Sequence, residues 1–313
     1  KLFNESLRDI ADMAGEAGLS FDIDRTDRGF SFYFAGYSDK LFSLIEAVTR
    51  AFSNDFGTQL EFNKIKRALA LDYKELSLAE PYPLVQYHKY DLMHKNNIHY
   101  TEYVGLLKTL ELKDIKLFHE KALKHVSVES YVYGNSNVEE VISIIERLYS
   151  ILGSNTMEVL KRPKDLIIKI PRGNSFYYYI RTKDQDAAWT SYFDFGTRNI
   201  HLSAVIQLGF GFLKGFFFDQ MRNNRGLGYI VESRLDFFEH VLGISFTVVS
   251  NKVSASRISK EAEIVFNDFI DYILQLSDED LELSRSSLIA SVSKQNRTIE
   301  EWMTDVVLTS VVN

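Results

Sequence analysis

The sequence predicts an α+β fold made of two tandem homologous domains, each an antiparallel-rich mixed sheet with helices packed on one face. With 313 residues, 45% hydrophobic and 25% charged, the chain is typical of a globular protein of two domains. "GLSFDI" at residues 18–23 is similar to "GLGYIV" at 226–231, and each follows a helical pattern and precedes a strand and another helix. This spacing is too long for a solenoid repeat and indicates duplicated domains.

The first block of the sequence alternates helical and strand patterns. Residues 2–17 carry apolar residues at helical spacing, and Gly18 ends that pattern. Ser38 is the expected N-cap of a second amphipathic helix. The expected elements are helix 2–17, strand 19–26, turn 27–29, strand 30–37, helix 38–54, a mostly helical stretch 58–125 interrupted at "EPYP", strand 126–135 and helix 136–152.

The second block predicts more strands and longer helices. A polar linker with Gly and Pro, residues 153–165, separates a domain at 1–160 from a domain at 166–313. Because the chain begins without methionine and ends at "LTSVVN", we expect a piece of a longer protein whose second domain is truncated. The expected elements are strands 166–171, 175–182 and 187–195, helix 198–224, strands 226–234 and 243–250, helix 254–276 and a helix from 277.

Composition excludes several classes of function. The balance of 36 basic and 43 acidic residues, without a basic run, disfavours a nucleic-acid partner. The absence of cysteine excludes disulfides, thiolate metal sites and cysteine nucleophiles, and it favours a reducing, cytoplasmic location. We expect no membrane span, because the most apolar run, residues 204–218, is interrupted by Lys214 and is better explained as a buried helix.

No catalytic motif occurs in the chain. A zinc hydrolase motif of the type H-E-x-x-H or H-x-x-E-H is absent, since "HEKAL" at His119 lacks a second histidine and "HYTEY" at His99 ends in Tyr103. His88 and His94 are six residues apart and would point to different sides of a helix. We therefore expect no metal site and no catalytic residues in this chain by itself. The G-x-S-x-G elbow is absent too.

Two segments carry a resemblance to a known family. "MRNNRGLGYIVESR" at 221–234 and "AGLSFDIDRTDRGFSFYFAGYSDKL" at 17–41, with "VYGN" at 132–135, resemble insulinase- and pitrilysin-type zinc metallopeptidases, in which insulin-degrading enzyme is found. The resemblance covers nearly the whole chain. It implies the zinc-free C-terminal half, domains three and four of four homologous domains with the metallopeptidase LuxS/MPP-like fold, closing a peptide-sized chamber against an N-terminal half.

The resemblance also implies where zinc lies. The family's inverted zinc motif belongs to the first domain, so zinc is expected in the missing N-terminal half and not in this chain. Transferring the motif to the fourth domain places its first histidine at His201, with Ala204 and Val205 in the Glu and His positions. The corresponding position of the third domain falls before Lys1. We therefore expect the full-length protein to be a metalloendopeptidase and this fragment alone to be inactive.

The resemblance assigns a role to four residues near the second repeat. Arg222 and Tyr229 are implied to reach the substrate, where a guanidinium and a phenol can donate hydrogen bonds to the scissile carbonyl. Gly226 and Gly228 would let the backbone turn and approach the sheet or a ligand closely. The alternative is structural: Tyr229 as a core aromatic residue, and Arg222 as a cation at a helix C-terminus.

Two functions follow as hypotheses. The first is the chamber-closing half of a peptidase, whose partners are the N-terminal catalytic half of the same polypeptide and peptide substrates. The second is a catalytically inert, peptidase-like scaffold or assembly subunit. A homo-oligomer is compatible with either, and substrate could also be bound as an added strand at a sheet edge.

Overall fold

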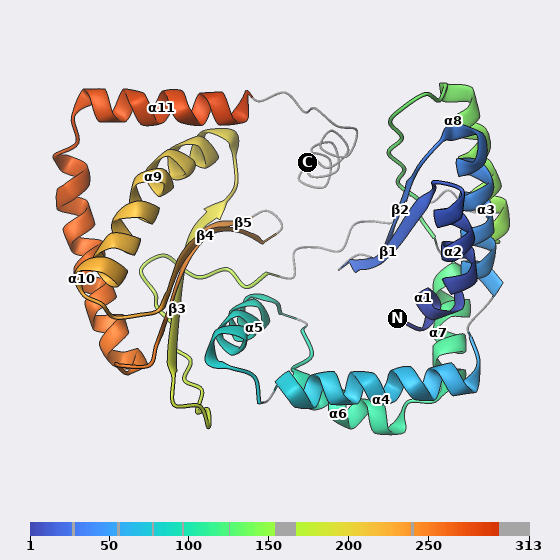
Figure 1. The fold of residues 1–313 in the computed structure, drawn as a ribbon, viewed down its shortest axis with the longest axis horizontal. Coiled ribbons are helices and arrows are strands. Elements are labelled where there is room, and N and C mark those ends of the chain that lie inside the picture. Colours follow the sequence, from blue (N-terminus) through green and yellow to red (C-terminus); the bar gives the residue numbers. More distant parts are fainter. Residues whose placement is uncertain are drawn as a thin grey trace.

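The computed structural model describes residues 1–26, 29–54, 57–76, 78–95, 97–124, 126–153, 167–238 and 241–293. The structure is a helix-rich α+β fold with two antiparallel sheets, one in each half of the chain (Figure 1), which confirms the predicted fold class. The elements are α1 (Leu2–Ser6), α2 (Arg8–Glu16), β1 (Ser20–Thr26), β2 (Gly29–Ala35), α3 (Ser38–Asn54), α4 (Gln59–Leu76), α5 (Pro81–Met93), α6 (Tyr100–Thr109), α7 (Leu112–Leu123), α8 (Val138–Leu152), β3 (Ala187–Thr197), α9 (Ile200–Phe218), the π-helix η1 (Asp219–Asn224), β4 (Ile230–Phe238), β5 (Val241–Ser250), α10 (Ala255–Leu274) and α11 (Asp278–Val292).

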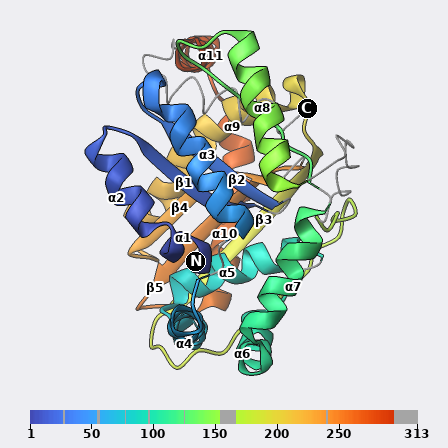
Figure 2. The same ribbon diagram turned by 90° about the vertical axis from the view of Figure 1, so that its right-hand side faces the viewer.

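The N-terminal sheet is the hairpin β1–β2, which pairs in continuous register from Ser20↔Ala35 to Thr26↔Gly29. Strand alternation places Leu19 and Ile23 on the side that packs against α2 and α3, where Val48 is fully buried. Figure 2 shows α3 and α8 lying together on the outer side of this hairpin. The hairpin therefore has helices on one face, as the sequence predicts.

The C-terminal sheet has the strand order β3-β5-β4, and both pairings are antiparallel. Its central strand β5 is buried along its whole length. On one face, Phe246 and Val248 pack with Phe217 of α9 and Val265 of α10 in the largest apolar core. The opposite face is polar, because Glu232 of β4 lies beside Thr247 of β5, and Arg234 lies beside Ser245.

Helix α5, from the N-terminal half, lies against this polar face of the C-terminal sheet. Tyr82 Oη donates a 2.6 Å hydrogen bond to Glu232 Oε2, and Gln86 Nε2 donates to Thr247 Oγ1 at 2.9 Å. Lys89 Nζ pairs with Asp236 Oδ2 at 2.7 Å in a contact where both side chains are largely buried. A helix distant in sequence thus satisfies the polar groups of this sheet face.

The contact between Tyr82 and Glu232 shifts the pKa values of both side chains. Burial tends to raise the pKa of the Glu232 carboxyl, but hydrogen bonds from Tyr82 and Arg234 outweigh it and hold that pKa below its usual range. Burial, with the hydrogen bond to Glu232, raises the pKa of Tyr82. The carboxylate and the neutral phenol are therefore the stable forms, and this contact keeps its hydrogen bond at neutral pH.

Three strand predictions are wrong. Residues 126–135 and 175–182 form no strand, and the described part of 166–171 contributes only an isolated bridge between Ile167 and His94. A strand forms only where a neighbouring strand supplies its hydrogen-bond partners. Within the described residues these segments instead make single contacts, such as Val128 N donating to Tyr149 Oη at 3.0 Å and Ile168 N donating to Met93 O at 2.8 Å.

Three other expectations concern helix ends and boundaries. The expected helix 2–17 is broken at Leu7, whose side chain is buried between α1 and α2. Helix α3 begins at Ser38 as expected, although the side chain of Ser38 lies outside the described part. Of the expected linker 153–165, only Gly153 is described, and the chain end at "LTSVVN" also lies outside. The two domain boundaries therefore stay predictions.

Helix α9 continues into η1 as the most apolar segment of the chain. Of the part of the chain that the structure describes, Ile200–Asn224 is the one stretch long and apolar enough to cross a membrane by length and composition, a test that core helices also pass. The prediction of a buried helix is wrong, because only 6% of its apolar window is buried. Phe217 is fully buried against the sheet, whereas Ile200 at the helix start is 91% exposed.

Candidate functional site

The four residues singled out from the sequence lie in one turn between α9 and β4. The helix widens into η1, a π-helix of the kind often found at functional sites. Leu227 N then donates to Met221 O at 2.9 Å, and Tyr229 N donates to Val249 O of β5 at 2.9 Å. Both Met221 and Leu227 are buried, so the turn is anchored to the core at each end.

Arg222 is a half-buried cation in this turn. Its Nη1 donates to the backbone carbonyl of Gly228 at 3.1 Å and makes a second, very short contact with the carbonyl of Tyr229. The guanidinium thus spans from the end of η1 to the start of β4. The structure brings Arg222 and Tyr229 together, and Arg222 holds the backbone that carries the phenol.

Tyr229 presents its phenol at the surface, with 45% of the residue exposed. Its Oη donates a 2.6 Å hydrogen bond to Asp186 Oδ2, just before β3. This hydrogen bond, with burial and the negative charge of Asp186, raises the pKa of Tyr229 to about 12. Tyr229 is therefore a neutral hydrogen-bond donor at physiological pH, and it is not the core aromatic of the structural alternative.

The two glycines of the turn have different roles. Gly226 has φ of +60°, in the left-handed region that favours glycine, and open space surrounds the position of a Cβ. A Cβ on Gly228 would lie 2.6 Å from Val248 Cγ1 and 2.8 Å from Val249 O. Gly226 thus allows the turn, and Gly228 allows the backbone to approach β5 closely.

Three acidic partners of this turn, and the Arg225 that binds two of them, were missed from the sequence. Asp186 lies 43 residues before Tyr229, and no motif links them. Arg225 forms ion pairs with Glu261 at 2.9 Å and with Asp268 at 3.0 Å, which tie the end of η1 to α10. The helical spacing of 261 and 268 places both carboxylates on one face of α10, which is the one signal the sequence offered.

The residues at the family's zinc position do not fit a metal in this chain. His201 is exposed near the start of α9, and Ala204 and Val205 supply no ligand atoms. Elsewhere, His119 packs edge to face on Phe52, with 5.4 Å between ring centroids. Among the described residues, one group of side chains could hold a metal ion: His88, Asp91 and His99.

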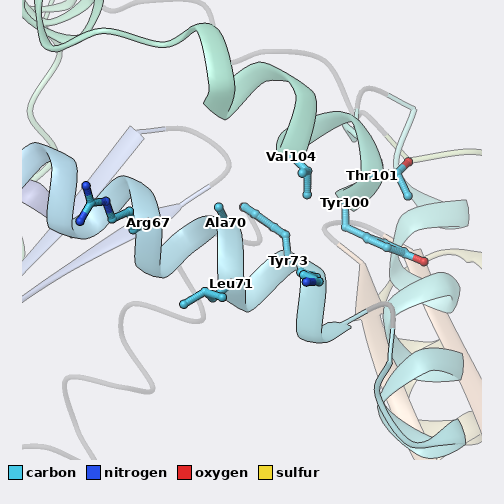
Figure 3. Close-up of a pocket in the computed structure, with 8 residues that line it drawn as sticks. Arg67, Ala70, Leu71, Tyr73, Tyr100, Thr101 and Val104 are labelled. Atoms are coloured by element: carbon cyan, nitrogen blue, oxygen red, sulfur yellow. The ribbon is translucent and has the colours of Figure 1, made fainter.

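A hollow of about 660 Å³ lies between α4 and α6 (Figure 3). Tyr73 of α4 lines one side of it, and Tyr100 and Thr101 at the start of α6 line the other. Its lining is mostly apolar and includes none of the four residues of the η1–β4 turn. The hollow and the turn are therefore separate features of the surface.

Two family models match successive parts of this two-sheet α+β chain. Residues 1–105 match the family described as "Middle or third domain of peptidase_M16". Residues 211–306 match the family described as "PQQ synthase PqqF-like, C-terminal lobe domain 4". Two successive parts of the chain are thus similar to domains of M16 peptidases, the insulinase and pitrilysin type.

Relatives of known name support this assignment. "Insulin-degrading enzyme-like 1, peroxisomal" of Arabidopsis thaliana is 23% identical over an alignment 312 residues long that covers 96% of this chain and 32% of that protein. Human "Insulin-degrading enzyme" is 22% identical over 80% of this chain and 25% of its own length. A third relative, from Schizosaccharomyces pombe, is named "Putative zinc protease mug138" and is 22% identical over 96% of this chain and 31% of its own length. The chain thus spans about a third of the length of the two Arabidopsis insulin-degrading-enzyme-like relatives.

Solved structures show the same fold. The crystal structure of pitrilysin superposes with a TM-score of 0.86 at 16% identity, covering 97% of this chain and 32% of that one. The structure of a "peptidase M16 inactive domain" from Pseudomonas fluorescens superposes with a TM-score of 0.58 at 13% identity, covering 91% and 69%. At these identities the likeness concerns the fold alone.

Proposed function

We propose that this chain is the C-terminal half of a zinc metalloendopeptidase and closes a peptide-binding chamber against an N-terminal half that holds the zinc. One observation carries the proposal. A third-domain match and a fourth-domain match follow one another along a chain about a third as long as its relatives. The residues at the zinc position of this chain offer one histidine and no further ligand, which agrees with a supporting role.

Tyr229 and Arg222 are the residues proposed to meet the substrate. The Tyr229 phenol is neutral and exposed, so it can exchange Asp186 for the carbonyl oxygen of a bound peptide. A donor placed where negative charge develops contributes most in the transition state. Arg222 positions this donor through the carbonyls of residues 228 and 229, and it would reach the substrate by releasing one of them.

Reconstitution from two halves tests the proposal. A quenched fluorescent peptide is offered to this chain alone, to the N-terminal half alone and to the mixture, and zinc is measured in each sample. We expect activity to rise strongly only in the mixture, with zinc in the N-terminal half. A mixture whose halves bind one another but cleave no peptide would contradict the proposal.

Replacing Tyr229 with Phe removes the donor and keeps the ring. We expect turnover of a peptide by the reconstituted enzyme to fall by ~10²-fold, because one donor to the developing oxyanion is lost. The melting temperature should change little, since among the described residues the hydroxyl bonds only to Asp186, at the surface. Tyr37→Phe is a matched control, because that ring is also exposed and lies outside the turn.

A scaffold without catalytic function is the second candidate. The observation that favours it is that both proposed substrate contacts already have partners within the chain: the guanidinium on backbone carbonyls, and the phenol on Asp186. Unchanged turnover in Tyr229→Phe, with intact assembly of the two halves, would favour this function. The compartment and the oligomeric state stay predictions under either candidate.

A further inference from the structure

Three potential metal ligands meet where α5 ends and α6 begins. His88 and Asp91 are one helical turn apart on α5, so their side chains share a face. His99 is the N-cap residue of α6 and returns toward that face. A ligand atom of each residue lies within 4.8 Å of the other two. The spacing 88, 91, 99 matches neither zinc motif considered from the sequence.

The two imidazoles each leave a buried nitrogen without a partner. His88 is only 5% exposed, and its Nε2 has no hydrogen-bond partner in the described parts of the chain. His99 Nε2 is likewise buried and unpartnered there. The two rings lie 5.5 Å apart and 30° from parallel. Because an unsatisfied buried polar atom costs free energy, two such atoms beside one carboxylate indicate a missing ligand.

Neighbouring residues orient two of the three ligands. Asn97 Nδ2 donates to Asp91 Oδ1 at 2.8 Å, which leaves the other carboxylate oxygen available. His99 Nδ1 lies 2.8 Å from Thr101 Oγ1. The same Nδ1 accepts a long, 3.5 Å contact from Thr101 N as the helix N-cap. Metal binding at Nε2 requires the other tautomer, in which Nδ1 carries the proton and donates to the Thr101 hydroxyl. Contacts of this kind fix ring orientation in known metal sites.

We propose that His88, Asp91 and His99 bind one divalent transition-metal ion, for which Zn²⁺ is the expected occupant. Two imidazole nitrogens and one carboxylate oxygen suit Zn²⁺, and three protein ligands leave a fourth position for water. Tetrahedral coordination at the usual bond lengths separates ligand atoms by about 3.3–3.6 Å. Closure from the present separation requires a shift of about 1 Å, which small side-chain rotations supply. This site revises the expectation that the chain holds no metal.

The position of the site gives the ion a structural role. Helix α5 carries Tyr82, Gln86 and Lys89 onto the C-terminal sheet, whereas α6 packs against α4. An ion bound by α5 and the first residue of α6 would join these two packing units. It would also fix Tyr100 and Thr101, which line the hollow beside α4 (Figure 3).

Metal titration of the intact 313-residue chain tests the site. Zn²⁺ binding is followed by calorimetry, and Co²⁺ is used as a probe because its visible absorption reports tetrahedral coordination. We expect one ion per chain and a melting temperature that rises with Zn²⁺. Asp91→Asn keeps the shape of the side chain and should weaken binding at least 10-fold, and Thr101→Val should weaken it about 10- to 100-fold by releasing His99.

The controls make each outcome decisive. His201→Ala removes an exposed histidine far from the group in sequence and should bind as the unaltered chain does. His99→Ala should abolish the Co²⁺ absorption, and circular dichroism verifies that each variant is folded. Equal binding by His99→Ala, Asp91→Asn and the unaltered chain would overturn the proposal. So would a folded, unaltered chain that binds no Zn²⁺.

Discussion

The two sheets are similar in the order of their local elements and differ in which elements cover their faces. In each, a glycine in the left-handed region follows a helix and leads into a strand: Gly18 with φ of +71° before β1, and Gly226 with φ of +60° before β4. The hairpin β1–β2 has helices on one face and an exposed opposite face, where Tyr33 is 37% exposed. Strand β5, by contrast, is buried along its whole length.

The difference comes from α5. This helix belongs to the segment that matches the third domain, yet its polar side chains contact β4 and β5. The C-terminal sheet is therefore completed by the other half of the chain, whereas the N-terminal hairpin is covered by its neighbours α2 and α3. Two units with a similar order of elements can thus differ in how far they depend on the rest of the chain. The buried polar face of the C-terminal sheet needs hydrogen-bond partners, and a helix from the other half of the chain supplies them.

Removing Lys89 from the contact between α5 and the C-terminal sheet gives the largest expected effect on stability. Lys89→Met leaves Asp236 without its charged partner in a largely buried place, and we expect a loss of about 3 kcal/mol in the free energy of unfolding. Urea denaturation followed by Trp189 fluorescence on β3 measures it.

Lys64→Met is the matched control in the N-terminal half. The Lys64–Glu5 pair is similar in length, at 3.0 Å, but Lys64 is mostly exposed. A surface pair of this kind contributes little to stability, so the loss should be much smaller than in Lys89→Met. Equal losses in the two variants would show that α5 is not needed to complete the C-terminal sheet.

Glycine substitutions are expected to have an intermediate effect on stability, and they test the glycine turn that precedes a strand in both sheets. Gly18→Ala and Gly226→Ala should each cost about 1 kcal/mol, because both place alanine in the left-handed region without a clash. Gly228→Ala should cost more, about 1–3 kcal/mol, because its methyl group would meet backbone atoms of β5 and β4. Chemical denaturation of the three variants measures these costs. If Gly228→Ala proved the mildest, the close approach to β5 would be unimportant for stability.

The smallest expected effect on stability is its pH dependence caused by the ionisation of Tyr229. Its pKa in the folded chain, about 12, exceeds the usual value of 10, so folding favours the protonated phenol. The stabilisation from its hydrogen bond is therefore complete below pH 10 and is lost as pH rises through 12. Asp186→Asn should lower this pKa, as measured by ultraviolet difference spectra against Tyr229→Phe. An unchanged pKa would mean that Asp186 is not its cause.

Local patterns predicted most of the elements correctly. The alternation of residues 19–26 and 30–37 predicted β1 and β2, and the helical periodicity of 38–54 predicted α3. The same reasoning failed for 126–135 and 175–182, because β-prone residues form a strand only beside another strand. Helix α9 was expected to be buried because of its composition, but composition does not report which neighbours cover a helix.

The sequence by itself determined the α+β class, the repeat at Gly18 and Gly226, and the turn that places Arg222 beside Tyr229. These features depend on residues close together in the chain, where periodicity and glycine conformation act directly. Only the tertiary structure decided that Tyr229 bonds to Asp186, that α5 crosses to the C-terminal sheet, and that His88, Asp91 and His99 converge. Each of these depends on the packing of elements separated by a turn or by many residues, which no local pattern encodes.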